Sequence, residues 1–353
     1  VMAFALNFDT SRTAKRDEMK AELKVYAQEL GAPFEEIPSF SDISALPISS
    51  RLEKYFQHGP FSIAHLPQVI FSPETGLVST PDGRIVSQCT LPVHEARALQ
   101  RNDKPHLRAS LAYESLPSGP TAIIGGSRNF YHWFLNVCSK VMALEKSQIG
   151  KEVETLLFSC AQSQFHKETI RSRPYLSERS THFATHPEPI LLNDVIVSTM
   201  HGNPIQSLDQ LAWIRETPCF APSPVGRRVY IDRKDSPSGV RQLHNSDEVR
   251  ELLKEFDFES VVLSELSLAE QAAVFREADC VVALHGAGLT NLIHCARRPH
   301  ILELSSEASF SNVFHALGKA TGVRRYDIIV GDDIPGRAKN KRDLRIDIAN
   351  IED

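Results

Sequence analysis

The chain has 353 residues, of which 42% are hydrophobic and 24% charged, and its formal net charge is −5. These values are typical of a globular protein with an ample core, and the length favours two packed domains. A net negative chain offers no basic field, so we expect no nucleic-acid partner. Its six cysteines show no CxxC pair and no zinc-ligand spacing, which favours a reducing, cytoplasmic compartment. No apolar run reaches about 18 residues, so we expect no membrane span.

The first third of the chain changes character twice. Residues 1–60 begin with a charged, helix-prone stretch that Gly31 and Pro33 would end, and continue as a proline- and serine-rich connector. We assign this part to an N-terminal helical and linker extension. From Phe61 to Val86, short β-like runs alternate with turn signals and indicate a small antiparallel element that feeds a larger domain.

Strands and helices then alternate in two blocks. The expected strands are 121–124, 154–159, 228–231, 260–263, 280–284 and 300–304, and the expected helices are 131–146, 247–256 and 268–278, with a helix start at 289–295. This alternation predicts parallel sheets with helices on both faces.

The proline-rich stretch 213–226 is the best candidate for a linker between the two blocks. We therefore divide the rest of the chain into an N-terminal α/β domain at 61–212, a C-terminal α/β domain at 227–330 and a tail at 331–353. The tail is either a final strand or a truncated helix. Two α/β blocks around a linker are typical of a two-domain enzyme with its site in the cleft.

One stretch of the second block carries the strongest functional signal. Leu284 ends a short apolar run, and His285-Gly286-Ala287-Gly288-Leu289-Thr290-Asn291 follows as a glycine turn that opens a helix-compatible segment. A strand, a glycine turn and a helix start present free backbone N–H groups to an anion. An ordinary turn that uses glycine only for its dihedral freedom is the alternative interpretation.

Several motifs taken together resemble glycosyltransferase family 61. In chain order they are Asn129-Phe130-Tyr131-His132-Trp133-Phe134, Tyr230-Ile231-Asp232-Arg233 with Arg241, Asn245 and Glu248, Ser267 to Gln271, and the glycine turn at 285–291. The resemblance covers about residues 120–310. This family includes bacterial capsular-polysaccharide transferases, plant xylosyl- and arabinosyltransferases and animal O-GlcNAc transferases.

The resemblance implies a GT-B-like fold, in which two Rossmann-like domains with parallel sheets face each other across a cleft. It also implies an inverting, metal-independent transferase that uses a nucleotide sugar, with a UDP-sugar as the first expectation. The donor would be a substrate, so we expect no cofactor. The acceptor would be a glycan or polysaccharide, and contact with the inner membrane surface stays open because a lipid-linked acceptor would require it.

The residues agree with metal-free handling of a diphosphate. The chain has no Asp-x-Asp and no convincing metal-ligand pair, so protein groups would have to neutralise the leaving diphosphate. Arg233 and Arg241 are the expected phosphate ligands, since guanidinium matches phosphate bidentately. The remaining expected donor-binding residues are His285, Gly286, Ala287, Gly288, Leu289, Asn291 and Glu303. For Arg233 the alternative is a surface ion pair with Asp232 or Asp235.

Inversion requires a base near the acceptor hydroxyl, and His132 is the leading candidate because imidazole titrates near working pH. The alternative is a buried structural histidine. Many family members carry Asp four residues after this histidine, whereas this chain has Asn136. Tyr131 and Trp133 are candidates for stacking on acceptor sugars, with a place in the core as the alternative.

Two further functions compete with the transferase. A catalytically silent nucleotide-sugar-binding or assembly subunit remains open because Asn136 cannot accept a proton. A nucleotide-dependent oxidoreductase is disfavoured, because Gly-x-Gly-x-x-Gly is absent and no acidic residue ends a suitable second strand.

Overall fold

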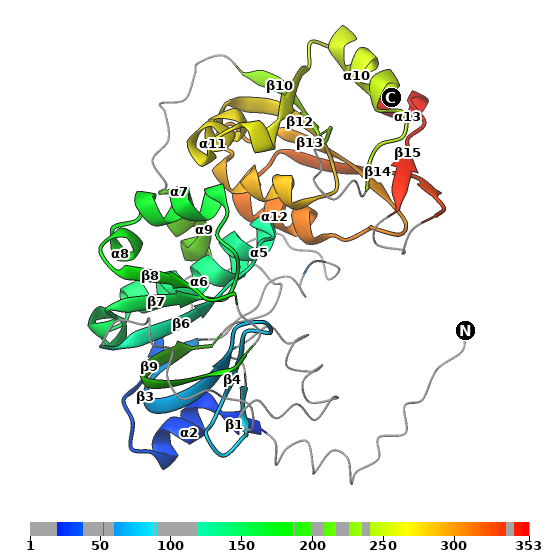
Figure 1. Cartoon of the computed structure of the whole chain (residues 1–353). Helices are drawn as coiled ribbons and strands as arrows, with labels where there is room; N and C mark the ends of the chain where they lie inside the picture. Colours follow the sequence, from blue (N-terminus) through cyan, green and yellow to red (C-terminus); the bar gives the residue numbers. More distant parts are fainter. Residues whose placement is uncertain are drawn as a thin grey trace.

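The computed structural model describes residues 20–37, 52, 60–87, 89, 119–185, 188–199, 208–216, 226–234, 241–336 and 342–352. Three sequence expectations fall partly outside these ranges: the helix before residue 20, the connector after residue 37 and the linker at 217–225. No helix in the described part is long and apolar enough to cross a bilayer. Two sheets, one above the other in Figure 1, organise this part of the chain.

The first sheet is mixed, with strand order β1-β5-β4-β3-β9-β6-β7-β8 and β2 beside β3. Its strands are β1 (Lys20–Glu22), β2 (Phe34–Ile37), β3 (Phe61–Ser72), β4 (Leu77–Ser79), β5 (Ile85–Ser87), β6 (Thr121–Gly125), β7 (Thr155–Phe158), β8 (Ser180–Phe183) and β9 (Ile190–Ser198). Strands β9, β6, β7 and β8 are parallel, whereas β3 is antiparallel to β2, β4 and β9. The expectation of a parallel sheet therefore holds for only part of it.

The expected N-terminal extension is corrected by this sheet. Strand β2 pairs with β3, with Phe34 opposite Ala64 and Ile37 opposite Phe61, and β1 pairs with β5. Helix α2 (Leu23–Glu29) buries Leu23, Tyr26 and Ala27, the i, i+3, i+4 spacing of one helix face. Residues 20–37 are thus part of the first sheet, because their apolar side chains find partners more than twenty residues away in the sequence.

The second sheet has the order β11-β10-β12-β13-β14-β15 and is parallel except for β15. Its strands are β10 (Arg227–Asp232), β11 (Glu259–Val262), β12 (Ala278–Leu284), β13 (His300–Ser306), β14 (Arg325–Ile334) and β15 (Asp343–Arg345). The expected parallel sheet is confirmed here. The expected tail is also part of it, because β15 pairs with β14 and buries Leu344 and Ile346 against the core.

Helices connect and cover the strands of both sheets. They are η4 (Ile149–Glu152), α7 (Gln164–Ser172), α8 (Pro174–Ser177), α9 (Leu208–Arg215), α10 (Ser246–Glu255), η5 (Leu263–Glu265), α11 (Leu268–Glu277), η6 (Ala287–His294), α12 (Val313–Thr321) and α13 (Ala349–Glu352). The helices expected at 247–256 and 268–278 are confirmed. The segment expected to start a helix at 289–295 is the 3-10 helix η6.

The helix expected at 131–146 is present as one run with a π-helical turn in its middle. It comprises α5 (Phe130–His132), η3 (Trp133–Val137) and α6 (Cys138–Lys146). The Asn129 side chain caps the run by accepting from the His132 backbone N–H at 3.2 Å. The π turn places Trp133 through Val137 in the core and leaves the preceding turn at the edge of the sheet.

One apolar cluster joins the layers of both sheets. It contains Trp133 and Phe134 from the first half together with Leu292 and Phe275 from the second. Helix α9 lies between the sheets (Figure 1), and Arg215 at its end donates to the Ile293 carbonyl oxygen. The division into separate domains stays a prediction, but the two sheets meet through a shared core at this level.

Candidate active site

The carboxyl ends of the parallel strands bring the predicted residues together. Arg233 follows β10 and His285 follows β12 in the second sheet, while β6 of the first sheet leads through a turn to His132. Chain segments that leave parallel strands at one edge are the usual place for ligands in α/β proteins. Two cavities lie where these segments meet.

The smaller cavity, which we call the histidine pocket, has a volume of about 200 Å³. His132 and Tyr131 line it from the first half of the chain, and Arg241, His285 and the Gly286–Ala287 backbone line it from the second. Four of the predicted site side chains thus face one cavity from the two halves of the molecule.

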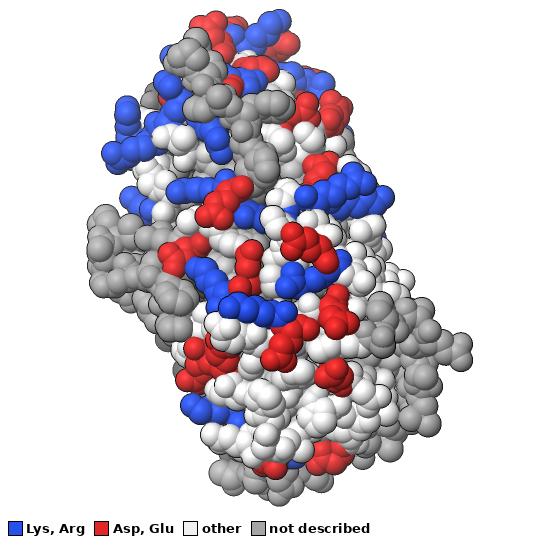
Figure 2. All heavy atoms as spheres, turned by 90° about the vertical axis from the view of Figure 1, so that its left-hand side faces the viewer, with Lys and Arg blue, Asp and Glu red and all other residues white. Residues whose placement is uncertain are grey.

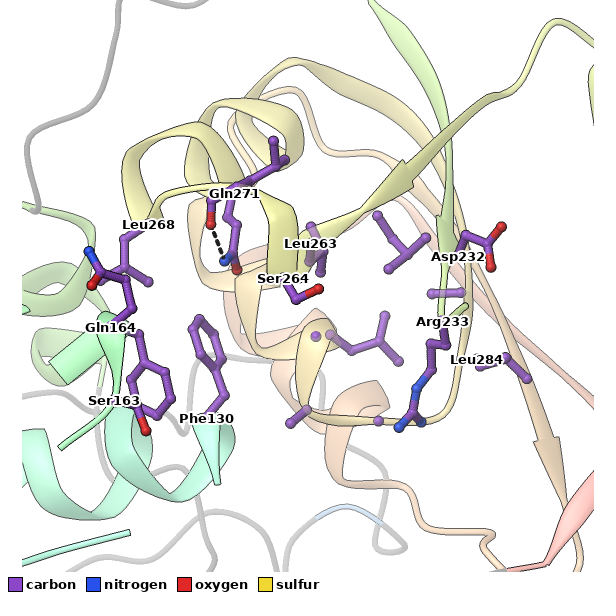
Figure 3. Close-up of a pocket in the computed structure, with 18 of the residues that line it drawn as sticks. Phe130, Ser163, Gln164, Asp232, Arg233, Leu263, Ser264, Leu268, Gln271 and Leu284 are labelled. Carbon is purple, nitrogen blue, oxygen red and sulfur yellow. Dashed lines mark hydrogen bonds between the residues drawn. The ribbon is translucent and has the colours of Figure 1, made fainter. Parts of the chain in front are cut away.

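The larger cavity, which we call the apolar pocket, has a volume of about 460 Å³. Phe130 and Phe165 line it from the first half, and Leu263, Leu268 and Leu289 are among its residues from the second. Figure 3 shows Phe130 and Gln164 toward one end and Arg233 toward the other. Gly286 and Ala287 belong to both pockets, so the glycine turn separates them.

The glycine turn is fitted closely around Arg233. The guanidinium Nη1 donates to the His285 carbonyl oxygen at 3.2 Å, and a Cβ on Gly286 would lie 2.7 Å from the same nitrogen. Glycine is therefore needed for the close approach of the guanidinium. Of the two alternative partners, Asp232 is held by Arg250 at 3.0 Å, and Asp235 lies outside the described residues.

The start of η6 offers backbone donors beside these side chains. Gly286 precedes the helix, and the Leu289 N–H bonds back to the Gly286 carbonyl oxygen at 3.0 Å. The first N–H groups of a helix have no intrahelical acceptor; of the residues at this start, Ala287 lines both pockets and Gly288 lines the apolar pocket. The arrangement is suited to an anion.

Asn291 and Leu289 support the turn from inside. The Asn291 side chain donates to the Gly288 carbonyl oxygen and to Gln271 Oε1, each at 3.1 Å, and is buried. Expected as a donor ligand, Asn291 instead fixes the turn. Leu289 is also buried, and it contributes to the wall of the apolar pocket.

Arg241 is a cation with no counter-charge among the residues that the structure describes. It lines the histidine pocket, and no hydrogen bond or ion pair joins its side chain to the described part of the chain. Burial lowers the pKa of its guanidinium, because desolvation disfavours the charged form. A partly buried guanidinium that faces a cavity is ready to receive an anionic ligand.

His132 is held by its own helix. Its Nδ1 lies 2.8 Å from Asn136 Oδ1, and the ring of Tyr131 packs edge-on at 5.3 Å. An amide oxygen only accepts, so Nδ1 donates the hydrogen of this contact. His132 lines the pocket and is not the buried structural histidine of the alternative interpretation.

Glu303 is placed differently from the expectation. Its side chain is completely buried and lines neither pocket; its two carboxylate oxygens accept from His285 Nδ1 and the Tyr326 hydroxyl. It is therefore not a ligand for donor hydroxyls. The strand register causes this, since Glu303 lies opposite Ala283 and shares its inward face.

Trp133 is also corrected. It is fully buried against Phe158 and His166, and its indole N–H donates to Thr169 Oγ1 at 3.2 Å. It is a core residue, because the π turn rotates it away from the pocket. Tyr131 does line the histidine pocket and contacts Phe314 edge-on at 5.6 Å.

Sequence reasoning missed three kinds of contributor. Phe314 and Ser311 line the histidine pocket from the segment after β13, and Tyr326 completes the Glu303 contacts. His166 fixes the turn before α5 by donating to the Ser127 carbonyl oxygen at 3.0 Å, and burial lowers its pKa. His166 had a local signal, the Ser163-x-x-His166 capping spacing; the others depend on strand register.

The face of the molecule in Figure 2 carries charges of both signs. Basic and acidic side chains are interspersed across it, and they do not form a continuous basic stripe. Charged side chains of the second half of the chain form ion pairs, such as Arg227 with Glu259 at 2.6 Å and Arg297 with Asp279 at 2.8 Å.

Comparison with known families decides the class of the protein. The family model described as Glycosyltransferase 61 matches residues 130–302. The chain belongs to glycosyltransferase family 61. It is thus a glycosyltransferase, an enzyme that moves a sugar from a donor to an acceptor. The match spans His132, Arg233, Arg241 and the glycine turn, and ends one residue before Glu303.

Other comparisons add little. No curated protein matches the chain. Among solved structures, the chain is similar to the dodecameric iron-containing heptosyltransferase TibC in complex with ADP-D-beta-D-heptose, with 9% identity over 71% of this chain and 77% of that chain and a TM-score of 0.33.

Proposed function

We propose that this glycosyltransferase transfers a sugar with inversion from a nucleotide-sugar donor to a glycan or polysaccharide acceptor without a metal ion. A UDP-sugar is the donor class that we would test first. In this proposal the two sheets belong to the two domains of a GT-B arrangement, and the two pockets form the cleft between them.

The guanidinium of Arg241, which pairs with none of the described residues, carries the proposal. Its partial burial without an anion is costly in the free protein and would be offset by a bound diphosphate. Gly286 and Ala287 form the wall shared by the pockets, and Arg233, which lines the apolar pocket, donates to the neighbouring His285 carbonyl oxygen. We place the diphosphate against these groups, where they replace the charge that a metal ion would supply.

The apolar pocket is then the place for the nucleoside. Its aromatic side chains, Phe130 and Phe165, lie 5.4 Å apart in an edge-on arrangement. Base planes stack favourably on such rings. This leaves the donor sugar at the histidine pocket, beyond the glycine turn.

His132 is the proposed base of the transfer. It approaches the histidine pocket from the first half of the chain, while the proposed diphosphate site belongs to the second. Inversion needs the acceptor oxygen and the leaving oxygen on opposite sides of the anomeric carbon. Nε2 of His132 accepts the acceptor hydroxyl proton as that oxygen attacks.

A silent nucleotide-sugar-binding subunit remains the second candidate, favoured by one observation. His132 is backed by the neutral side chain of Asn136 at 2.8 Å, which stabilises an imidazolium less than a carboxylate does.

The five described cysteines Cys89, Cys138, Cys160, Cys280 and Cys295 are free thiols, and we place the protein in the cytoplasm on that account.

Turnover separates the two candidates. The wild-type protein is incubated with UDP-, GDP-, CMP- and ADP-sugars in EDTA, with and without glycan acceptors, and release of nucleotide is measured. We expect release with one nucleotide class and a loss of about 100-fold or more in His132→Gln. Binding without release in the wild-type protein, with every donor and acceptor, would instead establish the silent subunit.

A further inference from the structure

Three polar groups meet beside the histidine pocket on one face of the second sheet: Glu303 is buried, and His285 and Tyr326 are partly buried. Glu303 in β13 is opposite Ala283 of β12 on one side and Ile328 of β14 on the other. His285 is two residues after Ala283, and Tyr326 is two residues before Ile328. Side chains two apart on a strand share a face, so the parallel register brings these three groups together.

The contacts among them form a single chain. His285 Nδ1 and the Tyr326 hydroxyl each donate to Glu303, one to each carboxylate oxygen. Burial and the neighbouring Glu303 raise the pKa of Tyr326 well above its usual value, which keeps the phenol protonated as a donor. The carboxylate, completely buried, is therefore satisfied on both oxygens.

Aromatic side chains pack against the ring of His285 and against Tyr326, and restrict the positions of both. Phe314 packs edge-on against the imidazole at 5.2 Å, and His315 stacks on Tyr326 at 4.9 Å with an interplanar angle of 15°. With a hydrogen on Nδ1 and the ring restrained, Nε2 occupies the opposite edge of the imidazole. Nε2 makes no hydrogen bond to the described residues, and His285 lines the histidine pocket.

We propose that Glu303 and Tyr326 are positioning residues that orient His285 so that its Nε2–H donates to the leaving phosphate oxygen of the donor. The inference rests on the proposed function and assigns the group that assists departure. As the acceptor oxygen bonds to the anomeric carbon, the bond from that carbon to the phosphate oxygen breaks. Its electron pair stays on the phosphate, which Nε2–H stabilises; the acceptor proton goes to His132.

The surroundings favour this role over that of a second base. Arg241, the side chain of His285 and the backbone of Gly286 and Ala287 all line the histidine pocket, so groups that can donate to an anion lie together there. A buried carboxylate at Nδ1 fixes the orientation of the His285 ring. His132, which lines the same pocket from the first half of the chain, has an amide oxygen at its Nδ1.

Steady-state kinetics test the inference. Glu303→Gln keeps the size of the side chain but removes its charge, and we expect kcat to fall on the order of 100-fold with the donor KM within about twofold. Tyr326→Phe should lower kcat about threefold to tenfold. Ser305→Ala is the matched control and should retain activity, since Ser305 is a buried residue of the same strand whose hydroxyl has no hydrogen-bond partner among the described residues.

A double-mutant cycle separates positioning from general support of the fold. His285→Asn keeps a donor for Glu303 but has no Nε2, and adding Glu303→Gln to it should change kcat less than about threefold. If kcat of the double variant fell by the product of the two single-variant losses, the inference would be overturned. Full activity in Glu303→Gln would also overturn it. A wild-type protein without transfer would instead refute the proposed function, and with it the role at the leaving phosphate.

The nitrogen resonances of His285 give a readout independent of turnover. In protein labelled with ¹⁵N-histidine and assigned by His285→Asn, we expect protonated Nδ1, and a shift of Nε2 when UDP is added. Glu303→Gln should change the Nδ1 signal while the melting temperature stays close to that of Ser305→Ala. An unprotonated Nδ1, or an Nε2 signal indifferent to bound UDP, would overturn the inference.

Discussion

Replacement of Arg241 by Met tests the anion site with two opposite effects. The side chain faces the histidine pocket, and burial alone shifts the pKa of its guanidinium. Methionine keeps an unbranched apolar stem and removes the charge. The nucleotide-free protein should therefore become no less stable, whereas its affinity for a nucleoside diphosphate should fall.

The size of the loss follows from the kind of contact. A hydrogen bond to a charged group contributes about 1.5–3 kcal/mol, which corresponds to a loss of roughly 10- to 150-fold in Kd. Because the guanidinium is proposed to contact the diphosphate, affinity for the bare nucleoside should be almost unchanged. The comparison of nucleoside, monophosphate and diphosphate thus locates the contact along the ligand.

Isothermal titration calorimetry in EDTA measures this series. Arg298→Met is the control, because Arg241 and Arg298 share the same left-handed backbone, each with φ of 54°, and Arg298 is outside both pockets. Equal diphosphate affinity in wild type and Arg241→Met, with both proteins folded, would refute the reasoning. A loss of equal size for the bare nucleoside would also refute it.

Three further changes have defined outcomes. Gly286→Ala should weaken diphosphate binding about tenfold and hardly change the melting temperature. The added Cβ would lie 2.7 Å from Nη1 of Arg233 and would displace the flexible end of that side chain. A large fall in melting temperature with intact binding would contradict this expectation. Asn136→Asp puts a carboxylate at Nδ1 of His132 and should move the acidic limb of the pH–rate profile of transfer to higher pH. An unchanged acidic limb would argue against His132 as the base. Burial lowers the pKa of His294 to about 4, so the unfolded chain binds the additional proton between about pH 6.5 and 4. The free energy of unfolding should therefore decrease as the pH is lowered through this window, by up to about 1.4 kcal/mol per pH unit. Urea unfolding of His294→Gln should show a smaller decrease. An equal slope in the two proteins would contradict the assignment.

Local sequence patterns predicted the second sheet well. Its strands are short apolar runs such as 280–284, and its helices carry cap signals such as Ser267 with Glu270, which form a capping box in the structure. The continuous helical run at 130–146 was also predictable, although its π turn was not. The strands and helix caps of the second sheet and the helical run at 130–146 all depend on residues that are close together in the sequence, so one sequence is enough to predict them.

Long-range pairing could not be predicted in the same way. The pairing of Phe34 with Ala64 joins segments between which no local pattern exists, so residues 20–37 were taken for an extension. Glu303 illustrates the same limit in the site. Its position at a strand end suggested a ligand, but the register of β12, β13 and β14 turns it inward to His285 and Tyr326.

The glycine turn and the two arginines were found by chemistry that is visible in the sequence. Arg233, Arg241 and Gly286 do line the two adjacent pockets, while their roles with a donor remain proposals. Trp133 had no signal that separated core from pocket, because an aromatic residue at a helix start suits either. In the structure, Trp133 lies in the π turn and is buried in the core.

Nucleotide binding tests the central claim most directly. A thermal-shift series of UDP, GDP, CMP and ADP, each with and without EDTA, is run on the wild-type protein and on Arg233→Ala. We predict that one nucleotide raises the melting temperature, that EDTA leaves the rise intact, and that Arg233→Ala abolishes it. Absence of a rise with all four nucleotides, or a rise that EDTA removes, would contradict a metal-independent donor site at the glycine turn.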